Sequence, residues 1–291
     1  MFSVIIPIYN SSATILEPIA SLNSQTLQDF EVLFCDDCSA DFVEVAEIIK
    51  KSAKFRFKVL QLPRHVNQVA ARNLAMAHAQ GDYFCFLDSD DSWDIRKLEL
   101  LSDRISKSRR PYSTLFFHPL VCRKEDGGTF VHPLRGKRPE ESVSSYLFFG
   151  NGMMQSSSLA FHRSAAARIG FDESSTTHED WDLALDAERA GLDFEYIDEP
   201  LGNWNVRRMI GKSQRDKAAV SLNWYEKGAR RFDAQGSAGF LINIIFPKLL
   251  AEKEVVAAGS LFLRSLVASP VLTAASFGRL WARVRAKTKR K

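Results

Sequence analysis

Short apolar runs alternate with amphipathic segments over the first part of the chain. Between the runs, apolar residues recur at helical spacing after Ser12, after Asp41 and over 67–80, where Gly81 closes the segment. The runs are rich in β-branched and aromatic residues, which favour strands. They lie at 3–8, 30–35, 57–62 and 83–87. Strands that alternate with helices predict a doubly wound α/β half with a mainly parallel sheet.

The pattern loosens after Asp91. A helix is predicted over 94–109, and loops rich in Gly, Pro and charge then separate three further strands, so this part reads as α+β. These strands are predicted at 115–118, 129–132 and 156–161. From about Lys217 the spacing is helical to the end, with interruptions predicted near 236–239, Pro247 and Pro270.

Composition places the chain among globular proteins. Its 291 residues leave room for about two domains, and 45% apolar with 25% charged content excludes a disordered or collagen-like chain. The net charge of +4 is unevenly spread, because no Asp or Glu follows Glu254 whereas eight Lys and Arg do. The mildly acidic body therefore argues against a domain that binds nucleic acid, which requires a basic face.

The cysteines and the tail bear on location. Four cysteines do not make a disulfide framework, and the first residues lack a basic signal region, so a cytoplasmic location is expected. The uncharged stretch 265–278 is shorter than the roughly 20 residues of a membrane span. Cys35 and Cys38 flank two aspartates, whose charge opposes a reactive thiolate, so redox chemistry is not predicted.

Polar clusters follow three of the predicted strands. Tyr9-Asn10 comes after the first, Asp36-Asp37 after the second and Asp88 to Asp91 after the fourth. In open α/β sheets ligands bind at the carboxyl ends of the strands. The alternative is that these residues only start turns and cap helices. Three clusters in register favour a ligand site in which a divalent cation offsets the repulsion between carboxylates.

Five segments of the chain resemble the family 2 glycosyltransferases. They are SVIIPIYN, EVLFCDDCSAD, NQVAARNLAMAHAQGDYFCFLDSDD, HEDWDLALDAERAG and GNWNVRR, which together span roughly the first 210 residues. The resemblance implies an α/β GT-A fold, a Rossmann-like nucleotide-diphospho-sugar transferase domain, followed by a C-terminal helical region. The expected division is 1–215, with a nucleotide half at 1–91 and an acceptor half at 92–215, and then 216–291 with its basic tail.

The resemblance also places residues on the nucleotide-sugar. A carboxylate only accepts hydrogen bonds, which suits the N3–H of uracil, so the resemblance favours a UDP-sugar donor. The donor-side residues are Pro7, Tyr9, Asn10, Asp36, Asp37, Arg72, Asp88, Ser89 and Arg207. The family commonly has a His where Met209 stands, and a Gly where Cys38 stands.

Metal and acceptor residues follow from the same resemblance. Asp88-Ser89-Asp90 matches the DxD motif, in which Asp90 together with Asp88 holds Mg²⁺ or Mn²⁺ and neutralises the leaving diphosphate. Asp180 matches the catalytic base, and the acceptor side is completed by His178, Glu179 and Trp181. The alternative is that these acids only favour the N-terminus of a helix over 180–190.

The resulting hypothesis is an inverting enzyme that transfers one sugar from a UDP-sugar to a hydroxyl of a glycan or lipid-linked acceptor. The resemblance associates this activity with bacterial surface polysaccharide or lipid-linked oligosaccharide assembly. Two alternatives remain at this stage, a sugar-phosphate nucleotidyltransferase and a non-catalytic nucleotide-sugar-binding protein. A nucleotidyltransferase is expected to carry a Gly-rich phosphate loop after the first strand. This sequence has Tyr9-Asn10-Ser11-Ser12 at that place instead.

The tail, residues 261–291, is amphipathic, basic and contains Trp281. This composition suits the interface of an anionic membrane, which would attach the enzyme peripherally to the inner face of the cytoplasmic membrane. The alternatives are that its apolar face packs on the catalytic domain or on a second subunit in a homo-oligomer. Nucleic acid is not expected as a partner, because no stacking aromatics lie among the final basic residues.

Overall fold

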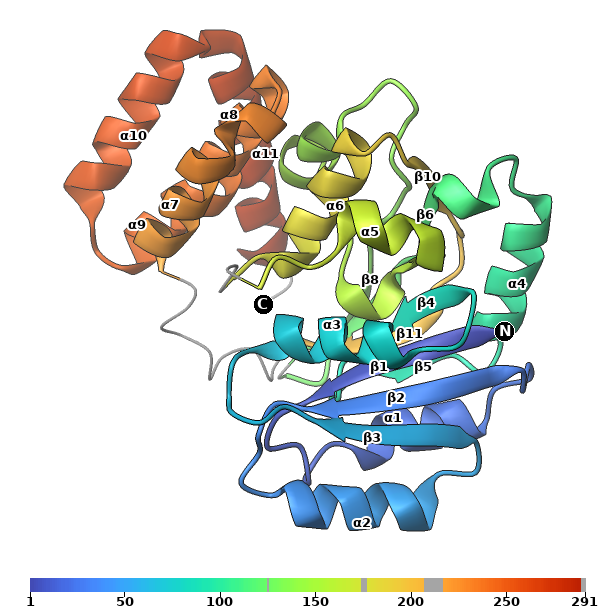
Figure 1. Ribbon diagram of the computed structural model, residues 1–291. Helices are drawn as coiled ribbons and strands as arrows, with labels where there is room; N and C mark the ends of the chain where they lie inside the picture. The colour runs from blue at the N-terminus through green and yellow to red at the C-terminus, as the bar shows by residue number, and fades with distance from the viewer. Residues whose placement is uncertain (125, 174–176, 207–216, 289–291) are drawn as a thin grey trace. The chain divides into compact units, whose positions relative to one another are not determined.

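The computed structural model describes residues 1–124, 126–173, 177–206 and 217–288. The chain forms two compact units, traced by colour from the N-terminus in Figure 1. The first unit takes in Met1–Gly136 and Met154–Ile210, and the second takes in Lys137–Met153 and Gly211–Lys291.

The first unit contains a seven-stranded sheet with the order β10-β6-β9-β4-β1-β2-β3. Strands β1 to β4 pair in parallel, and Ile8 lies beside Asp36 at the carboxyl ends of β1 and β2. The apolar runs of β1, β2 and β4 are buried throughout, as expected for parallel strands covered on both faces. The predicted α/β half is confirmed. The bounds are Phe2–Ile8 for β1, Phe30–Asp36 for β2, Arg56–Gln61 for β3 and Tyr83–Phe86 for β4.

Helices cover both faces of these strands. Helices α1 (Leu16–Asn23) and α2 (Phe42–Ser52) lie on one face and α3 (Gln68–His78) lies on the other (Figure 1). The predicted N-cap at Ser12 is wrong, because α1 begins only at Leu16. The Ser12 N–H instead donates to the Asp41 carboxylate at 2.8 Å, which links the loops that follow β1 and β2.

Strands from later in the chain complete the sheet. Strand β9 (Ala160–His162) runs antiparallel between β4 and β6 (Thr114–Phe117), and β10 (Asp193–Tyr196) extends the sheet beyond β6. The predicted strand over 156–161 is wrong in its first half. Ser156–Ser158 form a 3-10 turn, because the Gln155 side chain accepts a hydrogen bond from the Ser157 N–H at 2.7 Å and caps it.

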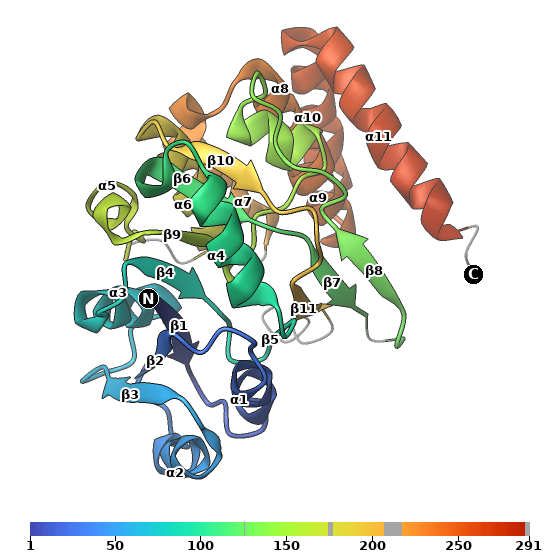
Figure 2. The ribbon, with the colours of Figure 1, turned by 90° about the vertical axis from the view of Figure 1, so that its right-hand side faces the viewer.

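A second, four-stranded sheet has the order β5-β11-β7-β8 (Figure 2). Only β8 was predicted, because the other strands are short and partly polar. Strand β11 pairs antiparallel with β5 and parallel with β7, so it brings Asn205 beside the segment that follows Asp91. The bounds are Ser92–Trp93 for β5, Leu120–Arg123 for β7, Thr129–His132 for β8 and Gly202–Asn205 for β11.

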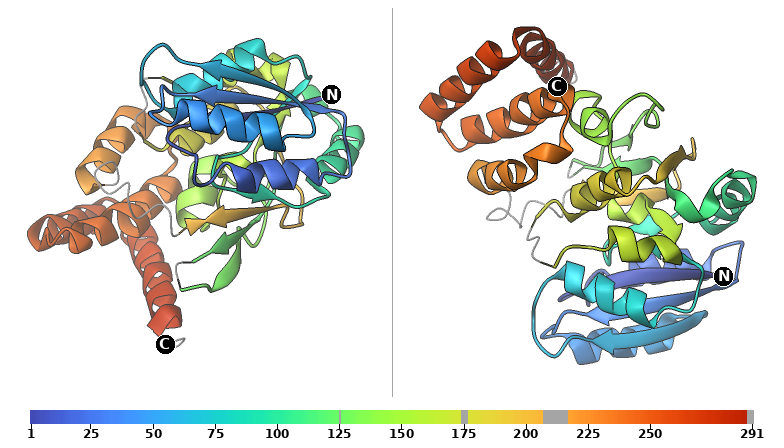
Figure 3. Two further views of the ribbon diagram at one scale, coloured as in Figure 1. Left: turned by 90° about the horizontal axis from the view of Figure 1, so that it is seen from below. Right: turned by 45° about the horizontal axis from the view of Figure 1, so that its top comes forward.

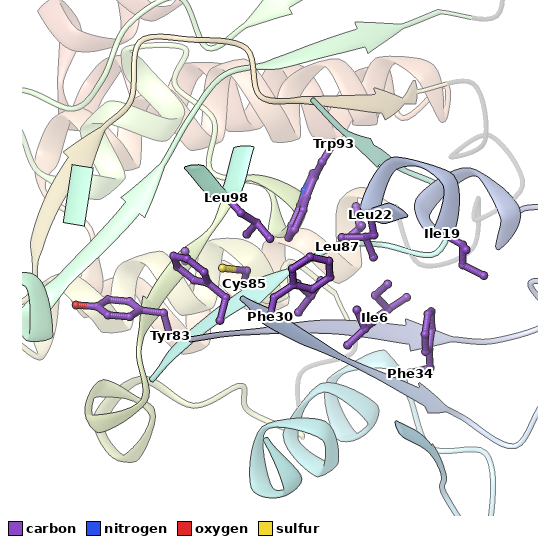
Figure 4. Close-up of a cluster of buried hydrophobic side chains, with 14 of the residues drawn as sticks. Ile6, Ile19, Leu22, Phe30, Phe34, Tyr83, Cys85, Leu87, Trp93 and Leu98 are labelled. Carbon is purple, nitrogen blue, oxygen red and sulfur yellow. The ribbon is translucent and has the colours of Figure 1, made fainter. Parts of the chain in front are cut away.

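An apolar cluster between β1, β2, β4 and their flanking helices forms the core of the first unit (Figure 4). Ile19 and Leu22 of α1 meet Ile6 and Phe34 of the sheet, and all four side chains are essentially inaccessible to water. Trp93 and Leu98 extend the cluster to α4 (Lys97–Lys107). Burying a side chain of this size contributes roughly 1.5–3 kcal/mol, which fixes the strands whose ends carry the polar clusters.

The second unit is helical, as predicted for the C-terminal region, and Figure 3 shows it from two directions. The fold class of an α/β unit with a C-terminal helical region is confirmed. Pro270 begins a helix as predicted, but 236–239 and Pro247 do not interrupt one. The bounds are Ala218–Gly228 for α7, Ala234–Phe240 for α8, Phe246–Ala251 for α9, Val255–Ala268 for α10 and Pro270–Thr288 for α11, with a π-helical turn, Leu241–Ile245, between α8 and α9.

Glycines in α8 serve close packing. A Cβ at Gly236 or Gly239 would collide with Ser144 or with the backbone at Phe148. The segment 137–153, which the sequence assigned to the acceptor half, therefore belongs with the C-terminal helices. Phe148 stacks on Phe232, with ring centroids 5.3 Å apart, and this aromatic contact explains the assignment.

Candidate active site

The loops after β1 and β2 meet at the carboxyl ends of these strands. Asn10 has a left-handed backbone with φ of 49°, and its side-chain oxygen accepts from the Ala40 N–H at 3.0 Å. Asp36 is fully buried, and its carboxylate accepts from Ser39 and from the Gln61 amide. The contacts of Asp36 are therefore internal, and they hold the loop in shape. Pro7 lies within β1 beside Cys35 and positions this end of the strand.

Asp37 is the centre of a second group of polar contacts. Its buried carboxylate accepts from the Val66 N–H at 2.7 Å and lies 2.9 Å from Nδ1 of His65. The His65 ring stacks on Tyr9, with centroids 4.3 Å apart, and Tyr9 is half exposed. Sequence reasoning missed His65, because nothing in its spacing connects it with Tyr9 or Asp37.

The end of β4 carries the DxD segment. Asp88 accepts from Arg72 Nη2 at 2.7 Å through one carboxylate oxygen and from the Gln155 amide at 3.0 Å through the other. Ser89 shares a hydrogen bond with Ser11, Oγ to Oγ at 2.9 Å, which joins this segment to the loop after β1. The strand-end clusters predicted from the sequence therefore lie together.

Asp91 is buried beneath the DxD segment. Its carboxylate accepts from the Ser157 hydroxyl at 2.6 Å and from the Asn205 N–H at 3.2 Å, and the Gln155 amide also reaches it. Burial, with the charge of Asp88, raises the pKa of Asp91 well above its ordinary value. Asp91 thus anchors the DxD segment to β11 and to the 3-10 turn. Sequence reasoning places Asp91 only as the last residue of the cluster Asp88 to Asp91.

Arg72 is a buried cation among acids. It is 1% exposed, its Nη1 lies 3.6 Å from a Glu179 oxygen, and its guanidinium carbon lies 5.2 Å from the centre of the Phe171 ring. Burial would lower its pKa, but the charges of Asp88, Asp180 and Glu179 raise it. The observed contacts of Arg72 are therefore with the protein's own carboxylates.

Asp180 stands in the first turn of α6 (Glu179–Arg189). It accepts a hydrogen bond from the Ser156 hydroxyl. Burial, with the neighbouring charge of Glu179, raises the pKa of Asp180 to about 7, although Arg72 and the Ser156 hydrogen bond act in the opposite direction. A carboxylate with this pKa near neutrality can accept a proton and release it again, which suits a general base.

The other predicted acceptor-side residues flank Asp180. His178 has a left-handed backbone immediately before α6, and its ring stacks on Trp181 with centroids 4.2 Å apart. The Glu179 carboxylate accepts from the Gln68 amide of α3. The structure thus brings all three beside the proposed base, and it leaves Arg207 and Met209 outside the described residues.

A buried lysine supports the 3-10 turn from below. Lys97 donates to the Ser157 carbonyl at 3.0 Å, lies 2.8 Å from Nε2 of His118 and sits 4.0 Å above the Trp93 ring. Burial lowers the pKa of Lys97 to about 7 and holds that of His118 well below its ordinary value, with Lys97 contributing to the latter. Sequence reasoning missed this group, since Lys97 has the spacing of an ordinary helix residue.

The carboxylates that follow β4 are the candidate ligands for a divalent cation. Among the described residues, no three or more His, Cys, Asp or Glu side chains are grouped to hold a metal ion. Both Asp88 oxygens already accept hydrogen bonds, and Asp90 is half-buried in the segment that follows β4. Mg²⁺ is commonly held by one or two carboxylates together with substrate phosphates. This strand end therefore fits a cation that binds together with a diphosphate, through Asp90.

The cysteine pair is not built for redox chemistry. Cys35 is buried in β2, and burial together with Asp36 and Asp37 raises the pKa of its thiol to about 12. Cys38 is exposed, with a left-handed φ of 59°. That backbone conformation explains why glycine suits this position.

The chain is similar to known glycosyltransferases in sequence. A sequence model of the family described as Glycosyl transferase family 2 matches residues 3–170, more than half of the chain. The amylovoran biosynthesis glycosyltransferase AmsB of Erwinia amylovora is 33% identical over 230 residues, which cover 77% of this chain and 76% of AmsB. A second relative, the UDP-Glc:alpha-D-GlcNAc-diphosphoundecaprenol beta-1,3-glucosyltransferase WfgD of Escherichia coli, is 37% identical over 100 residues, 34% of this chain and 39% of WfgD.

Solved structures share the fold. The crystal structure of S. aureus TarS 1-349 in complex with UDP-GlcNAc superposes with a TM-score of 0.62 at 20% identity, covering 96% of this chain and 89% of that one. The corresponding complex with UDP superposes with a TM-score of 0.58 at 19% identity, covering 100% of this chain and 92% of that one.

Proposed function

The chain belongs to the family 2 glycosyltransferases, and from that premise we propose that it transfers a single sugar from a UDP-sugar to an acceptor hydroxyl with inversion. The family resemblance stated from the sequence is thereby confirmed, and it sets aside the nucleotidyltransferase alternative. The observation that carries the proposal is the position of Asp180. The pKa of its carboxylate is raised to about 7. The buried guanidinium of Arg72 interacts electrostatically both with Asp180 and with Asp88 of the DxD segment.

The donor side of the proposal uses the ends of β1, β2 and β4. Asp37, Tyr9 and His65 supply a carboxylate and two stacked rings, a combination that suits the N3–H and the flat face of uracil. The names of relatives support this choice, because WfgD uses UDP-Glc and TarS was crystallised with UDP-GlcNAc. Asp36 and Asn10 shape the loop, and Ser89 joins it to the DxD segment.

A divalent cation, Mg²⁺ or Mn²⁺, would be held by Asp90 with the donor diphosphate, and it would supply positive charge to the leaving group. Arg72 and Gln155 orient Asp88 beside this site, so Asp88 positions the DxD segment rather than completing a protein-only metal site. Asp91 anchors the segment from below.

The acceptor side requires a base. The Asp180 carboxylate takes the proton of the acceptor hydroxyl while the hydroxyl oxygen bonds to the anomeric carbon, and the bond from that carbon to the diphosphate oxygen breaks, releasing UDP. Because the attack and the departure occur on opposite faces, a single displacement inverts the anomeric centre. His178 and Trp181 present a stacked pair of rings beside the base, a surface suited to a sugar.

The biological setting is proposed from the relatives. AmsB is named for amylovoran biosynthesis and a Bacillus subtilis relative, 38% identical over 101 residues, is named for teichuronic acid biosynthesis. We place this chain in bacterial surface polysaccharide assembly, with a glycan or lipid-linked acceptor, at the cytoplasmic side where UDP-sugars are made.

The proposal is tested by UDP release from a panel of UDP-sugars with water as acceptor, which needs no knowledge of the natural acceptor. Asp180→Asn should lower turnover by roughly 10²–10⁴-fold and leave UDP binding unchanged. Asp103→Asn, on an exposed ion pair of α4, is the matched control and should keep full activity. A fall in UDP affinity as large as the fall in turnover would make Asp180 structural, and absence of UDP release from every donor would favour the non-catalytic alternative.

The metal is tested separately by the thermal shift that UDP produces. UDP at about 100 times its dissociation constant should stabilise the fold by about 2.7 kcal/mol in the presence of Mn²⁺. EDTA, or Asp90→Asn, should remove most of that shift. An unchanged shift in EDTA would contradict the assignment of a cation to Asp90.

A further inference from the structure

Helix α10 is apolar on both of its sides. Its inner side contributes Phe262, whose ring lies 6.1 Å from Phe246 of α9 and 5.2 Å from Phe277 of α11, centroid to centroid. Its outer side carries Val256, Leu263 and Val267, which are 88%, 62% and 86% exposed. A helix that is apolar all round is typical of a protein core or of a lipid environment.

Three exposed aliphatic residues share one side of α10. Val256, Leu263 and Val267 are spaced by seven and four residues, which places them on the same side of α10. Val271 stands at the start of α11, directly after the turn between the helices, and is 78% exposed. These four residues are named the outer face of the α10–α11 hairpin.

Three hydroxyl side chains of the hairpin are buried. Ser265 of α10 and Thr273 and Ser276 of α11 are buried, and the Thr273 hydroxyl donates to the Ser265 carbonyl at 2.7 Å. The hydroxyl oxygens of Ser265 and Ser276 have no hydrogen-bond partner among the described residues. Small hydroxyl residues between helices, with branched aliphatic residues outside, are typical of helices that face lipid.

The charge around the outer face is positive. Arg264, Arg279 and Arg285 are exposed, and Arg285 lies over the ring of Trp281 with its guanidinium carbon 5.3 Å from the centroid. No acidic residue follows Glu254. Aliphatic residues, Trp and Arg on one helical hairpin match a membrane interface that contains anionic headgroups.

Helix α10 is too short to cross a bilayer. Helix α10 has 14 residues, about 21 Å at 1.5 Å per residue, whereas the hydrocarbon core is about 30 Å thick. One segment of the described chain, Ala234–Ala251, is long and apolar enough to span by length and composition alone. Its Phe240, Ile242 and Ile245 are fully buried, and a third of the segment is buried within the chain.

We infer that the outer face of the α10–α11 hairpin inserts into the interface of an anionic membrane. Val256, Leu263, Val267 and Val271 enter the boundary between headgroups and acyl chains, and Arg264 and Arg285 contact the headgroup phosphates. Arg279 is held over the Phe149 ring, with its guanidinium carbon 4.4 Å from the centroid, and is not assigned to the headgroups. The structure moves the membrane contact from the whole segment 261–291 to one face that begins earlier, at Val256. This inference goes beyond the proposed function, because it does not depend on which sugar or acceptor is used.

The test is co-sedimentation of the full chain with phosphatidylcholine vesicles and with vesicles that also contain phosphatidylglycerol. The wild type should bind the anionic vesicles, and binding should weaken as salt is raised. Replacing the four outer-face residues by Ser should lower the affinity at least tenfold. Val43→Ser with Leu134→Ser is the matched control, because both residues are equally exposed, at 76% and 81%, in the first unit.

Two further readouts decide between the membrane and other occupants. Trp281 emission should shift to the blue with anionic vesicles, and the shift should be absent in Trp281→Phe. Light scattering should give the same mass for the wild type and the outer-face variant. If the wild type is a dimer and the outer-face variant is a monomer, the face belongs to a contact with a second copy and the inference is overturned. Vesicle binding that is independent of lipid charge and salt, or that persists after the four substitutions, would also overturn it. Thermal melts of each variant, expected to match the wild type at exposed sites, show that it folds.

Discussion

The sheet unit and the α10–α11 hairpin place apolar side chains in opposite ways. In the sheet unit, strands such as β1 and β2 are buried throughout, and carboxylates gather where the strands end. In the hairpin, Val256 and Val267 face outward while Thr273 and Ser276 face inward. The sheet unit removes its apolar surface from water by folding, whereas the outer face of the hairpin stays exposed in the folded chain.

The exposure of an apolar side chain indicates a binding surface only when the packing of its neighbours is considered as well. Scattered exposed apolar residues are normal on any protein, and Val43 of α2 is one of them. The outer face differs because three of its members share one side of α10, and because the buried side of the hairpin includes hydroxyl groups as well as Phe262. The first unit instead buries two basic side chains, Arg72 and Lys97. Neighbouring carboxylates raise the pKa of Arg72, and burial lowers the pKa of Lys97.

The largest expected effect concerns the interior of the second unit. Phe240 is fully buried and its ring lies 5.5 Å from that of Trp224 and 5.0 Å from that of Phe148, centroid to centroid. Phe240→Ala should lower the free energy of unfolding by about 3–5 kcal/mol, because it leaves a cavity among aromatic rings. Denaturant unfolding followed by Trp fluorescence measures the loss. Leu134→Ala on the surface of the first unit is the control, and an equally small loss in both would mean that the second unit has no packed interior.

The next effect sharpens the role of charge in the first unit. Asp180 must be ionised to take a proton, and its pKa is raised to about 7. The value of kcat/KM should therefore rise by nearly tenfold per pH unit well below 7, about fiftyfold between pH 5 and 7, and level off above. The pH profile of UDP release measures this. A profile that is flat below neutral pH, with UDP binding unchanged, would remove Asp180 from the role of base.

Lys97 predicts a pH dependence of stability. Its pKa is lowered to about 7 in the folded state, so above that pH the unfolded chain binds one more proton than the folded one. The free energy of unfolding should therefore rise with pH from about 7 towards the ordinary pKa of lysine, by up to about 1.4 kcal/mol per unit. Unfolding curves at several pH values for the wild type and Lys97→Met measure the difference. Parallel pH dependences for the two proteins would contradict the neutral, buried lysine.

The smallest expected effect concerns the outer face in water. Val267→Ser removes a methyl-rich side chain that is 86% exposed, so the free energy of unfolding should change by less than about 0.5 kcal/mol. The melting temperature without lipid measures this. A loss of several kcal/mol would show that Val267 is covered in solution, and would break the contrast between the two regions.

The local pattern determined the first half of the fold and the polar strand ends. Apolar runs and helical spacing placed β1 to β4 and α2 to α4 within a few residues, because parallel strands are buried on both faces and need continuous apolar runs. The order and spacing of the motifs also predicted Asp88 to Asp91 and Asp180 as site residues, since these residues lie at the ends of recognisable elements along the chain.

Only the tertiary structure decided which side chains meet. Tyr9 and His65, or Asp91 and Asn205, are far apart in the sequence, and their contact depends on how β5 and β11 pair and on where the loops close. The short strands of the second sheet have no periodicity long enough to read. The two sides of α10 are likewise alike in sequence, both being apolar, so exposure distinguishes them only after Phe262 has packed against Phe246 and Phe277. Sequence fixes the affinity of each residue for water, whereas packing decides which apolar residues remain in contact with it.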